Sequence, residues 1–533
     1  MRKFLWVVAV GALVLALAAP AMALDLKFGG QYRVRFYAGP NTGFGERDGS
    51  QGGNPRGVQI RLRPIFDVSD DNGNIQARLW LEIGDIEFGG GGGAHGPTYG
   101  SSTIYAGYGF GAAGQNFLGT GFSGARVGNG AGGSMGNDGI NVETKNAYID
   151  FQMPWGLPLR TRAGIFYWYT PKGILVDDDV AGVKLYGASG PLKYSAAWYR
   201  AVSGTNNNSA AAVFQNPNGT WQVAGPLGNS VVYAMNSTQE DNNYDFYEFR
   251  VDWAAAPFFN PGLYLIYGDN RVNCQNNNVI NGNVTNAPTC GPGYDHARAS
   301  YYIGLTDTGK LGIVSYDLDF VYGYADGGPT GTFGASGGVG QHTVTGFGID
   351  GGLHMPVGPV TVNFGAAYFS GDSGLGEDKS TGFPTISPAW QGPGGGMEMI
   401  GNGGAFDAVH YTGGAPINIW GIGAWLEYRP VKALYTKLAY GFAGFAKKAG
   451  NCALNTPPYF TFGVGQNGPC WGPAYYGRPD KPIKGQSYIG QELSLRADYD
   501  LWTGFKVQGE LGWLVPSKGD VAQEYILQLL YNF

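Results

Sequence analysis

Residues 57–87 read GVQIRLRPIFDVSDDNGNIQARLWLEIGDIE, and the two halves of this stretch carry the pattern that decides the fold. In the first half, the apolar Ile60 and Leu62 alternate with the basic Arg61 and Arg63, and the second half alternates in the same way. Successive side chains of a β-strand point to opposite faces, so each half predicts a strand with one apolar and one charged face. An Asp-Asp-Asn-Gly sequence between the halves predicts a tight turn.

The same alternation recurs along the chain in eighteen blocks. The number is even, which places both ends of the barrel chain on the same side. Sixteen strands is the alternative, because the blocks 181–187 and 263–270 are brief. The predicted strands are residues 24–38, 57–68, 75–87, 141–153, 159–169, 181–187, 192–202, 244–254, 263–270, 296–306, 312–325, 343–355, 360–370, 417–429, 434–445, 487–500, 505–515 and 523–533.

The lengths of the connections separate two classes of all-β fold. Short turns alternate with long loops, of which the Gly-rich stretch at about 88–140 and the stretch at 371–416 are examples. A soluble sandwich shares the period-two pattern but does not produce this asymmetry. A transmembrane antiparallel β-barrel does, with short periplasmic turns and long external loops. We therefore predict an all-β barrel of about eighteen strands.

The composition agrees with a barrel and excludes several other classes. Charged residues make up 14% of the chain and aromatic residues another 14%, so neither an ordinary soluble enzyme nor a disordered chain is expected. After the first 20 residues no apolar run reaches the 18 or more residues of a membrane helix. The five His show no nucleophile–base arrangement, so we expect no catalytic residue and no enzyme.

The first residues predict export. Arg2 and Lys3 precede an apolar stretch that ends at Pro20, and a small-x-small sequence follows, as in a secretory signal peptide. We expect residues 1–23 to be removed and residues 24–533 to form one barrel domain. Without Arg2 and Lys3, 32 basic residues stand against 40 acidic ones, a net charge of −8. A mildly acidic chain without a basic patch predicts no nucleic-acid partner.

The four cysteines lie in two polar segments of this exported chain. Cys274 and Cys290 are 16 positions apart, and Cys452 and Cys470 are 18 apart. The spacing predicts two local disulfides that hold two long loops. Neither pair has the CxxC spacing of zinc or redox sites, and no haem-attachment motif occurs, so no metal or cofactor is expected.

The last block supplies a resemblance to a known family. Tyr525, Leu527, Leu529, Tyr531 and Phe533 alternate with more polar positions, and Phe533 is the final residue. This pattern resembles the C-terminal signature of Gram-negative outer-membrane barrels, which the barrel-assembly machinery reads through residues such as Tyr531 and Phe533. With the export signal and the loop asymmetry, the chain resembles bacterial porins of the homotrimeric type.

The resemblance implies a homotrimer in outer-membrane lipid that lets ions and small hydrophilic solutes diffuse passively. Two features depart from general porins. The strand count is eighteen rather than sixteen, and the third external connection, 171–180, is short while the second is very long. A substrate-specific channel is therefore the alternative, and a structural or adhesive surface barrel is the less favoured one.

The inward positions of the first five strands predict a basic ladder along one wall of the lumen. An acidic run in the next connection would face this ladder if it bends inward, and the opposed charges would set up a transverse field. The alternatives are that the arginines only solvate a polar lumen and that the acidic run is an exposed loop. The ladder is Arg33, Arg35, Arg61, Arg63, Arg78, Arg160 and Arg162, and the run is Asp177, Asp178 and Asp179.

The choice between a general and a specific channel stays open in the sequence. The Gly-rich loop at 88–140 carries Phe110, Phe117 and Phe122, which favours insertion into the lumen over a flexible external loop. Trp80 and Tyr148 are the inward aromatic residues that the early strands offer, which is little for a sugar-binding path.

Overall fold

The computed structural model describes most of the barrel wall and part of the loops. The described residues are 24–40, 56–88, 142–154, 156–203, 213–215, 221–223, 243–270, 278–280, 283–285, 298–329, 341–371, 379–401, 416, 418–447, 487–517 and 521–533. The predicted signal peptide, the Gly-rich loop at 88–140 from residue 89 onward and all four cysteines lie outside these residues.

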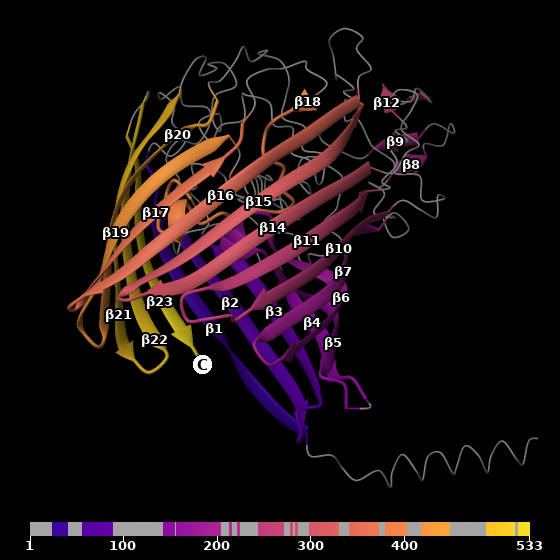
Figure 1. Ribbon diagram of the computed structural model, residues 1–533, viewed down its shortest axis with the longest axis horizontal. Helices are drawn as coiled ribbons and strands as arrows, with labels where there is room; N and C mark the ends of the chain where they lie inside the picture. Colours follow the sequence, from indigo (N-terminus) through magenta and orange to yellow (C-terminus); the bar gives the residue numbers. More distant parts are fainter. Residues whose placement is uncertain are drawn as a thin grey trace, which may run out of the picture.

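Eighteen strands form one closed antiparallel sheet, and Figure 1 shows the first strand beside the last. Strand β1 pairs with β2 on one side and with β23 on the other, where Arg35 is opposite Gln528. The predicted eighteen-strand barrel is confirmed. The wall consists of β1 (Leu24–Ala38), β2 (Arg56–Asp70), β3 (Ile75–Glu87), β4 (Val142–Gln152), β5 (Leu159–Tyr169), β6 (Asp177–Ser189), β7 (Leu192–Ser203), β10 (Asn243–Trp253), β11 (Asn260–Asn270), β14 (Arg298–Leu311), β15 (Val314–Pro329), β16 (Gln341–Val357), β17 (Val360–Phe369), β19 (Ile419–Val431), β20 (Leu434–Phe445), β21 (Tyr488–Trp502), β22 (Phe505–Pro516) and β23 (Ala522–Asn532).

Five short strands and two 3-10 turns of the described residues lie outside the wall. The pairs β8 (Val213–Gln215) with β9 (Trp221–Val223) and β12 (Asn278–Ile280) with β13 (Asn283–Thr285) are separate two-stranded sheets, and β18 (Lys379–Ser380) pairs with β16. Two 3-10 turns, η2 (Pro171–Gly173) and η4 (Pro393–Gly395), belong to loops. No helix among the described residues is long and apolar enough to cross a membrane.

The barrel has a short-turn end and a long-loop end. Two residues join β6 to β7, β14 to β15, β16 to β17, β19 to β20 and β21 to β22. Gly312, in one of these turns, has a φ of 63°, which glycine adopts without strain. The predicted strands 296–306 and 312–325 end and begin too early here, because β14 continues to Leu311 and the turn lies at residues 312 and 313. The first residues of β1 and the last of β23 both lie at the short-turn end, as the even strand count requires.

The two faces of the wall differ as the alternation predicts. On the outer face, large apolar side chains such as Leu79, Leu305, Phe364 and Leu495 are exposed, while the inner face buries charged and polar ones. Exposure of so many large apolar side chains around a closed sheet fits lipid rather than water. The lipid-facing band and the closed sheet define a transmembrane β-barrel.

Candidate functional site: a plugged, charged lumen

Two loops from the long-loop end meet inside the barrel and form one body, which we call the plug (residues 170–176 and 379–401). Val176 bridges to Ser387, and Leu175 accepts backbone N–H bonds from Ile386 and Ser387 at 3.1 and 2.9 Å. Farther along, Ala389 donates to the carbonyl of Gly173 at 3.0 Å. These bonds join two segments more than 200 residues apart in the chain, so the two loops are expected to move together.

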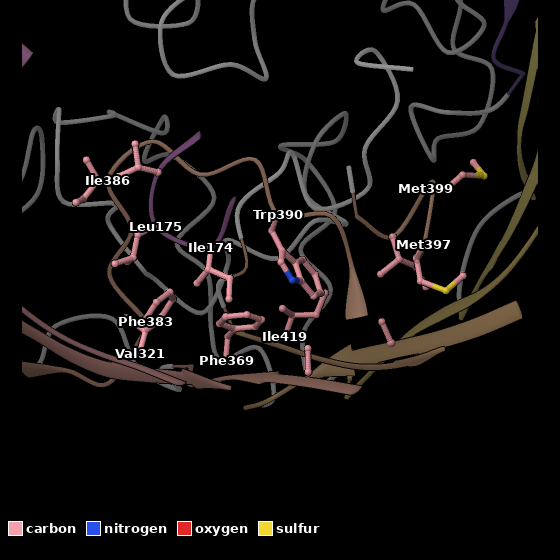
Figure 2. Close-up of a cluster of buried hydrophobic side chains, with 14 of the residues drawn as sticks. Ile174, Leu175, Val321, Phe369, Phe383, Ile386, Trp390, Met397, Met399 and Ile419 are labelled. Carbon is pink, nitrogen blue, oxygen red and sulfur yellow. The ribbon is translucent and has the colours of Figure 1, made fainter. Parts of the chain in front are cut away.

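Apolar side chains fix the plug against the inner wall. Ile174 and Leu175 of one loop pack with Phe383 and Trp390 of the other, above Phe369 and neighbouring wall residues (Figure 2). All five are essentially buried. Burying a large apolar side chain contributes about 1.5–3 kcal/mol, so this cluster favours the inserted position of both loops.

Glycines on the inner wall make room for the plug. A Cβ added at Gly365 would lie 2.3 Å from the carbonyl oxygen of Pro393, and one at Gly423 would lie 2.6 Å from the Sδ of Met397. Real Cβ atoms do not approach a backbone oxygen so closely, so a larger residue at Gly365 would displace the plug, whereas at Gly423 the flexible side chain of Met397 would have to move. Part of the chain's high glycine content is thereby explained by an inner wall shaped to hold loops.

Asp350 on β16 anchors both loops at one carboxylate. Its Oδ1 accepts a bond from Lys172 Nζ at 2.7 Å and from the backbone N–H of Gly394 at 3.0 Å. Its Oδ2 accepts the indole N–H of Trp390 at 2.8 Å. Asp350 is fully buried, and a buried charge held this way is costly to disturb.

Lys172 lies in a cluster of three carboxylates. Besides Asp350, its Nζ pairs with Asp317 and lies 3.5 Å from Asp319, both on β15. Burial lowers the pKa of Lys172, but the carboxylates of Asp350, Asp317 and Asp319 raise it further, so its pKa lies above the ordinary value. Lys172 therefore stays charged and ties a loop that follows β5 to the wall at β15 and β16.

A second anchor holds the far end of the plug. Both carboxylate oxygens of Glu492 on β21 accept backbone N–H bonds from Glu398, Met399 and Ile400, at 2.7 to 3.0 Å. The side chain of Glu398 pairs with Lys437 on β20 at 2.8 Å. Because the plug touches β6, β16 and β21, which lie in different parts of the wall, it crosses the lumen.

The predicted basic ladder lies on the inner face, and burial divides it into two groups. Arg33, Arg35 and Arg61 are 1 to 8% exposed, so other parts of the protein cover these three side chains. The side chains of Arg63, Arg78, Arg160 and Arg162 are 22 to 35% exposed. The more exposed arginines lie toward the short-turn end.

Carboxylates on neighbouring strands pair with the ladder, and sequence reasoning did not nominate them. Asp150 on β4 accepts bonds from Arg160 at 2.7 Å, from Arg162 at 2.9 Å and from the hydroxyl of Tyr186 at 2.6 Å. The guanidinium of Arg162 also lies 4.3 Å from the ring centre of Tyr148. Arg78 binds Asp67 through two nitrogens, and Arg63 binds Glu82. Such pairing fixes the arginines in position and reduces the net charge they present.

The acidic run belongs to a strand rather than to a loop, which corrects the predicted boundary of 181 for β6. Asp177, Asp178 and Asp179 pair in register with Tyr169, Trp168 and Tyr167. The pairing of β5 with β6 extends as far as Asp177, because the aromatic side chains of β5 are well suited to paired strands.

Each carboxylate of the run has a local partner. Asp178 accepts a bond from Ser387 of the plug at 2.8 Å, Asp177 accepts one from Tyr167 at 2.6 Å, and Asp179 pairs with Lys145 at 2.8 Å. The acids that pair with the ladder are instead Asp67, Glu82 and Asp150.

The inner wall also carries aromatic residues that sequence reasoning missed. Trp168 stacks on Tyr199 with 4.3 Å between ring centres and lies 5.3 Å from Phe246, and Phe166 lies 5.8 Å from Tyr199. These residues come from β5, β7 and β10, and all are buried. Alternation on β5 assigns Phe166 and Trp168 to the same face, but the contacts with Tyr199 and Phe246 on other strands were not predicted from the sequence.

The predicted assembly residues lie where the barrel closes. Phe533 exchanges two backbone hydrogen bonds with Gly30, at 2.9 and 3.0 Å, and its ring lies 5.8 Å from that of Tyr531. Tyr531 pairs with Tyr32 on β1. Both side chains point outward and are about two-fifths exposed. In the described part of the chain, no group of three or more His, Cys, Asp or Glu residues is arranged to hold a metal ion.

An eighteen-strand closed barrel with an apolar outside and a charged, loop-narrowed inside has the architecture of a porin. No protein-family model matches the chain, and no curated protein is similar to it in sequence. Among solved structures it is similar, for example, to an outer membrane protein and two further proteins of Pseudomonas aeruginosa, each at 10% identity and a TM-score of 0.48, covering 96% of this chain and 98% of theirs. They are OpdK, OccK9 (OpdG) and OccK8 (OprE).

Neutralising Arg61, Arg63 and Arg162 together is expected to shift ion selectivity toward cations. All three lie on the inner face, and their loss leaves Glu82 and Asp150 with fewer positive partners. We expect the potassium-to-chloride permeability ratio, measured as a reversal potential in a KCl gradient, to rise about twofold or more. Arg429→Gln, exposed at the short-turn end of β19, is the control and should leave the ratio unchanged. Equal reversal potentials for the triple variant and the wild type would refute a role for the ladder in selectivity.

Proposed function

We propose that the chain is a non-enzymatic channel of the Gram-negative outer membrane that lets small hydrophilic solutes and ions cross by passive diffusion. The observation that carries the proposal is the combination of a lipid-facing closed barrel with a charged inner wall. An adhesive or structural barrel needs no such lumen. Arginines paired with carboxylates around an open vestibule give water-soluble solutes a polar surface to follow.

The presence of the plug favours a narrow, substrate-specific channel over a general diffusion pore. A general diffusion pore keeps a wide opening, whereas here two loops fill part of the cross-section and are tied to three regions of the wall. A channel narrowed in this way discriminates between solutes by size and charge. We therefore favour the substrate-specific alternative over the general pore.

Swelling of liposomes that contain the purified protein tests this function. Swelling in an isosmotic solution of a small solute such as glycine is expected, because the solute and water enter through the lumen. Swelling in a disaccharide of similar osmolarity is expected to be at least about tenfold slower, since the plug leaves little room. Equal rates for both solutes would support a general pore, and no swelling in any solute would refute the channel.

The same proposal includes the export, orientation and assembly of the channel. Residues 1–23 direct export and are removed, the short turns face the periplasm, and Tyr531 and Phe533 are read by the barrel-assembly machinery. The mature chains assemble as a homotrimer, with lipid around the assembly. Cross-linking of the purified protein in mild detergent distinguishes a trimer from a monomer.

A further inference from the structure

One side of the plug faces wall residues whose polar atoms have no partner. Ser494 on β21 and Glu524 on β23 are 1 to 2% exposed, yet the Ser494 hydroxyl and one Glu524 carboxylate oxygen make no hydrogen bond. On the plug, one carboxylate oxygen of Glu398 also makes no hydrogen bond. A buried polar atom left unpaired destabilises the contact, and a water molecule that enters and binds it removes this cost.

These residues form one continuous strip. In the sheet register, Ser494 is opposite Gly512, and Gly512 is opposite Glu524, so the three lie side by side on the inner face. A Cβ at Gly512 would lie 2.8 Å from the Sδ of Met399, so the plug covers this strip directly. We call the contact between the plug at Glu398–Met399 and the inner faces of β21, β22 and β23 the polar seam.

The contact of the plug with the opposite wall is more apolar, although buried hydroxyls without a partner also occur elsewhere, at Thr385 of the plug and at Ser300 on β14. At the opposite wall the plug packs Trp390 and Phe383 against Phe369, and the polar atoms of Asp350 are fully used by three donors. Hydration of an apolar contact is unfavourable, and breaking the Asp350 anchor exposes a buried charge pair. The polar seam is thus the part of the plug contact that water separates most easily.

Charges of both signs surround the polar seam. Glu524 interacts electrostatically with Glu398, Glu510 and the cationic Arg35. Lys437 and Arg496 add positive charge on β20 and β21. A hydrated passage here therefore offers partners to ions of either sign and to small solutes that carry both.

We propose that solutes cross the plugged section along the polar seam, beside Glu398, Ser494 and Glu524, and not along the wall at β15–β17. This inference rests on the proposed channel function and assigns the route within it. In this arrangement the plug stays fixed against the wall at β15–β17, and solutes pass between the plug and the wall at β21–β23.

Cysteine accessibility under current recording tests the route with a matched pair of serines. Ser494 on β21 and Ser300 on β14 are both buried, inward-facing serines, 2 and 3% exposed, and β14 is distant from β21 in the sheet order. The full-length variants Ser494→Cys and Ser300→Cys change one atom each, so both should fold. A cationic methanethiosulfonate reagent is added to conducting channels, where a cysteine thiolate forms a mixed disulfide and releases methanesulfinate. The wild type, with its own four cysteines, sets the background.

The proposal predicts that the reagent reduces the current of Ser494→Cys by at least about half and leaves Ser300→Cys at the wild-type level. Glu524→Cys, a second variant on the seam, should also lose current. Loss of current in Ser300→Cys alone would overturn the route, and so would an unchanged current in both seam variants. Absence of current from every folded protein, wild type included, would instead overturn the channel function itself.

Discussion

Asp350→Ala is expected to convert the narrowed channel into a wide one. The substitution removes the acceptor for Lys172, for the indole of Trp390 and for the backbone N–H of Gly394, so both loops lose their shared anchor. Breaking a buried charge pair from one side costs about 3–5 kcal/mol, which corresponds to a shift of more than about 100-fold toward the displaced plug. Single-channel conductance in KCl should rise severalfold, with frequent steps between levels.

The matched control for this prediction is Asp350→Asn. The single amide oxygen can accept from Trp390 or from Gly394, which donate to different oxygens of Asp350, and the charge that attracts Lys172 is gone. Its conductance is expected to lie between those of the wild type and Asp350→Ala. Circular dichroism confirms that the barrel is intact in each case. A conductance for folded Asp350→Ala that equals the wild-type value would show that the anchor does not hold the plug.

Glu492→Ala is expected to release the other end of the plug. Three consecutive backbone N–H groups, from Glu398 to Ile400, would lose their acceptor, and each costs about 1–3 kcal/mol if it stays buried without one. The segment should therefore leave the wall and become hydrated. Because the anchor at Asp350 remains, we expect a smaller rise in mean conductance than for Asp350→Ala and larger fluctuations of the open current.

Gln491→Ala serves as the control on the neighbouring position. Gln491 lies on the outer face of the same strand, where it accepts a bond from the hydroxyl of Tyr440. Its loss should leave conductance and current noise at wild-type values. If Gln491→Ala and Glu492→Ala gave the same traces, the effect would be one of strand stability and not of the plug anchor.

The period-two pattern was sufficient to predict the wall. Inward arginines such as Arg61 and Arg162 could be placed because alternation assigns a face to each residue of a strand. Strand ends were less certain. The start of β6 at Asp177 was missed because three consecutive Asp resemble a loop, and only their pairing with Tyr167–Tyr169 makes them a strand.

The plug could not be predicted in the same way. Its contacts join residues far apart in sequence, such as Lys172 with Asp350, and no local pattern encodes such a pair. A weaker signal was present in the glycines at alternate inward positions, including Gly421 and Gly423, which mark where loops approach the wall closely. Alternation assigns Asp317 and Asp319 to the inner face in the same way, but their partner, Lys172 in a distant loop, could not be predicted.

The central claim, that this barrel is a channel narrowed by its own loops, is tested most directly by planar-bilayer recording of the wild type in a KCl gradient. The account predicts small, discrete current steps with a measurable reversal potential, and larger steps for Asp350→Ala under the same conditions. Large ohmic steps from the wild type with no selectivity would contradict the plug, and a folded protein that passes no current, with or without Asp350, would contradict the channel.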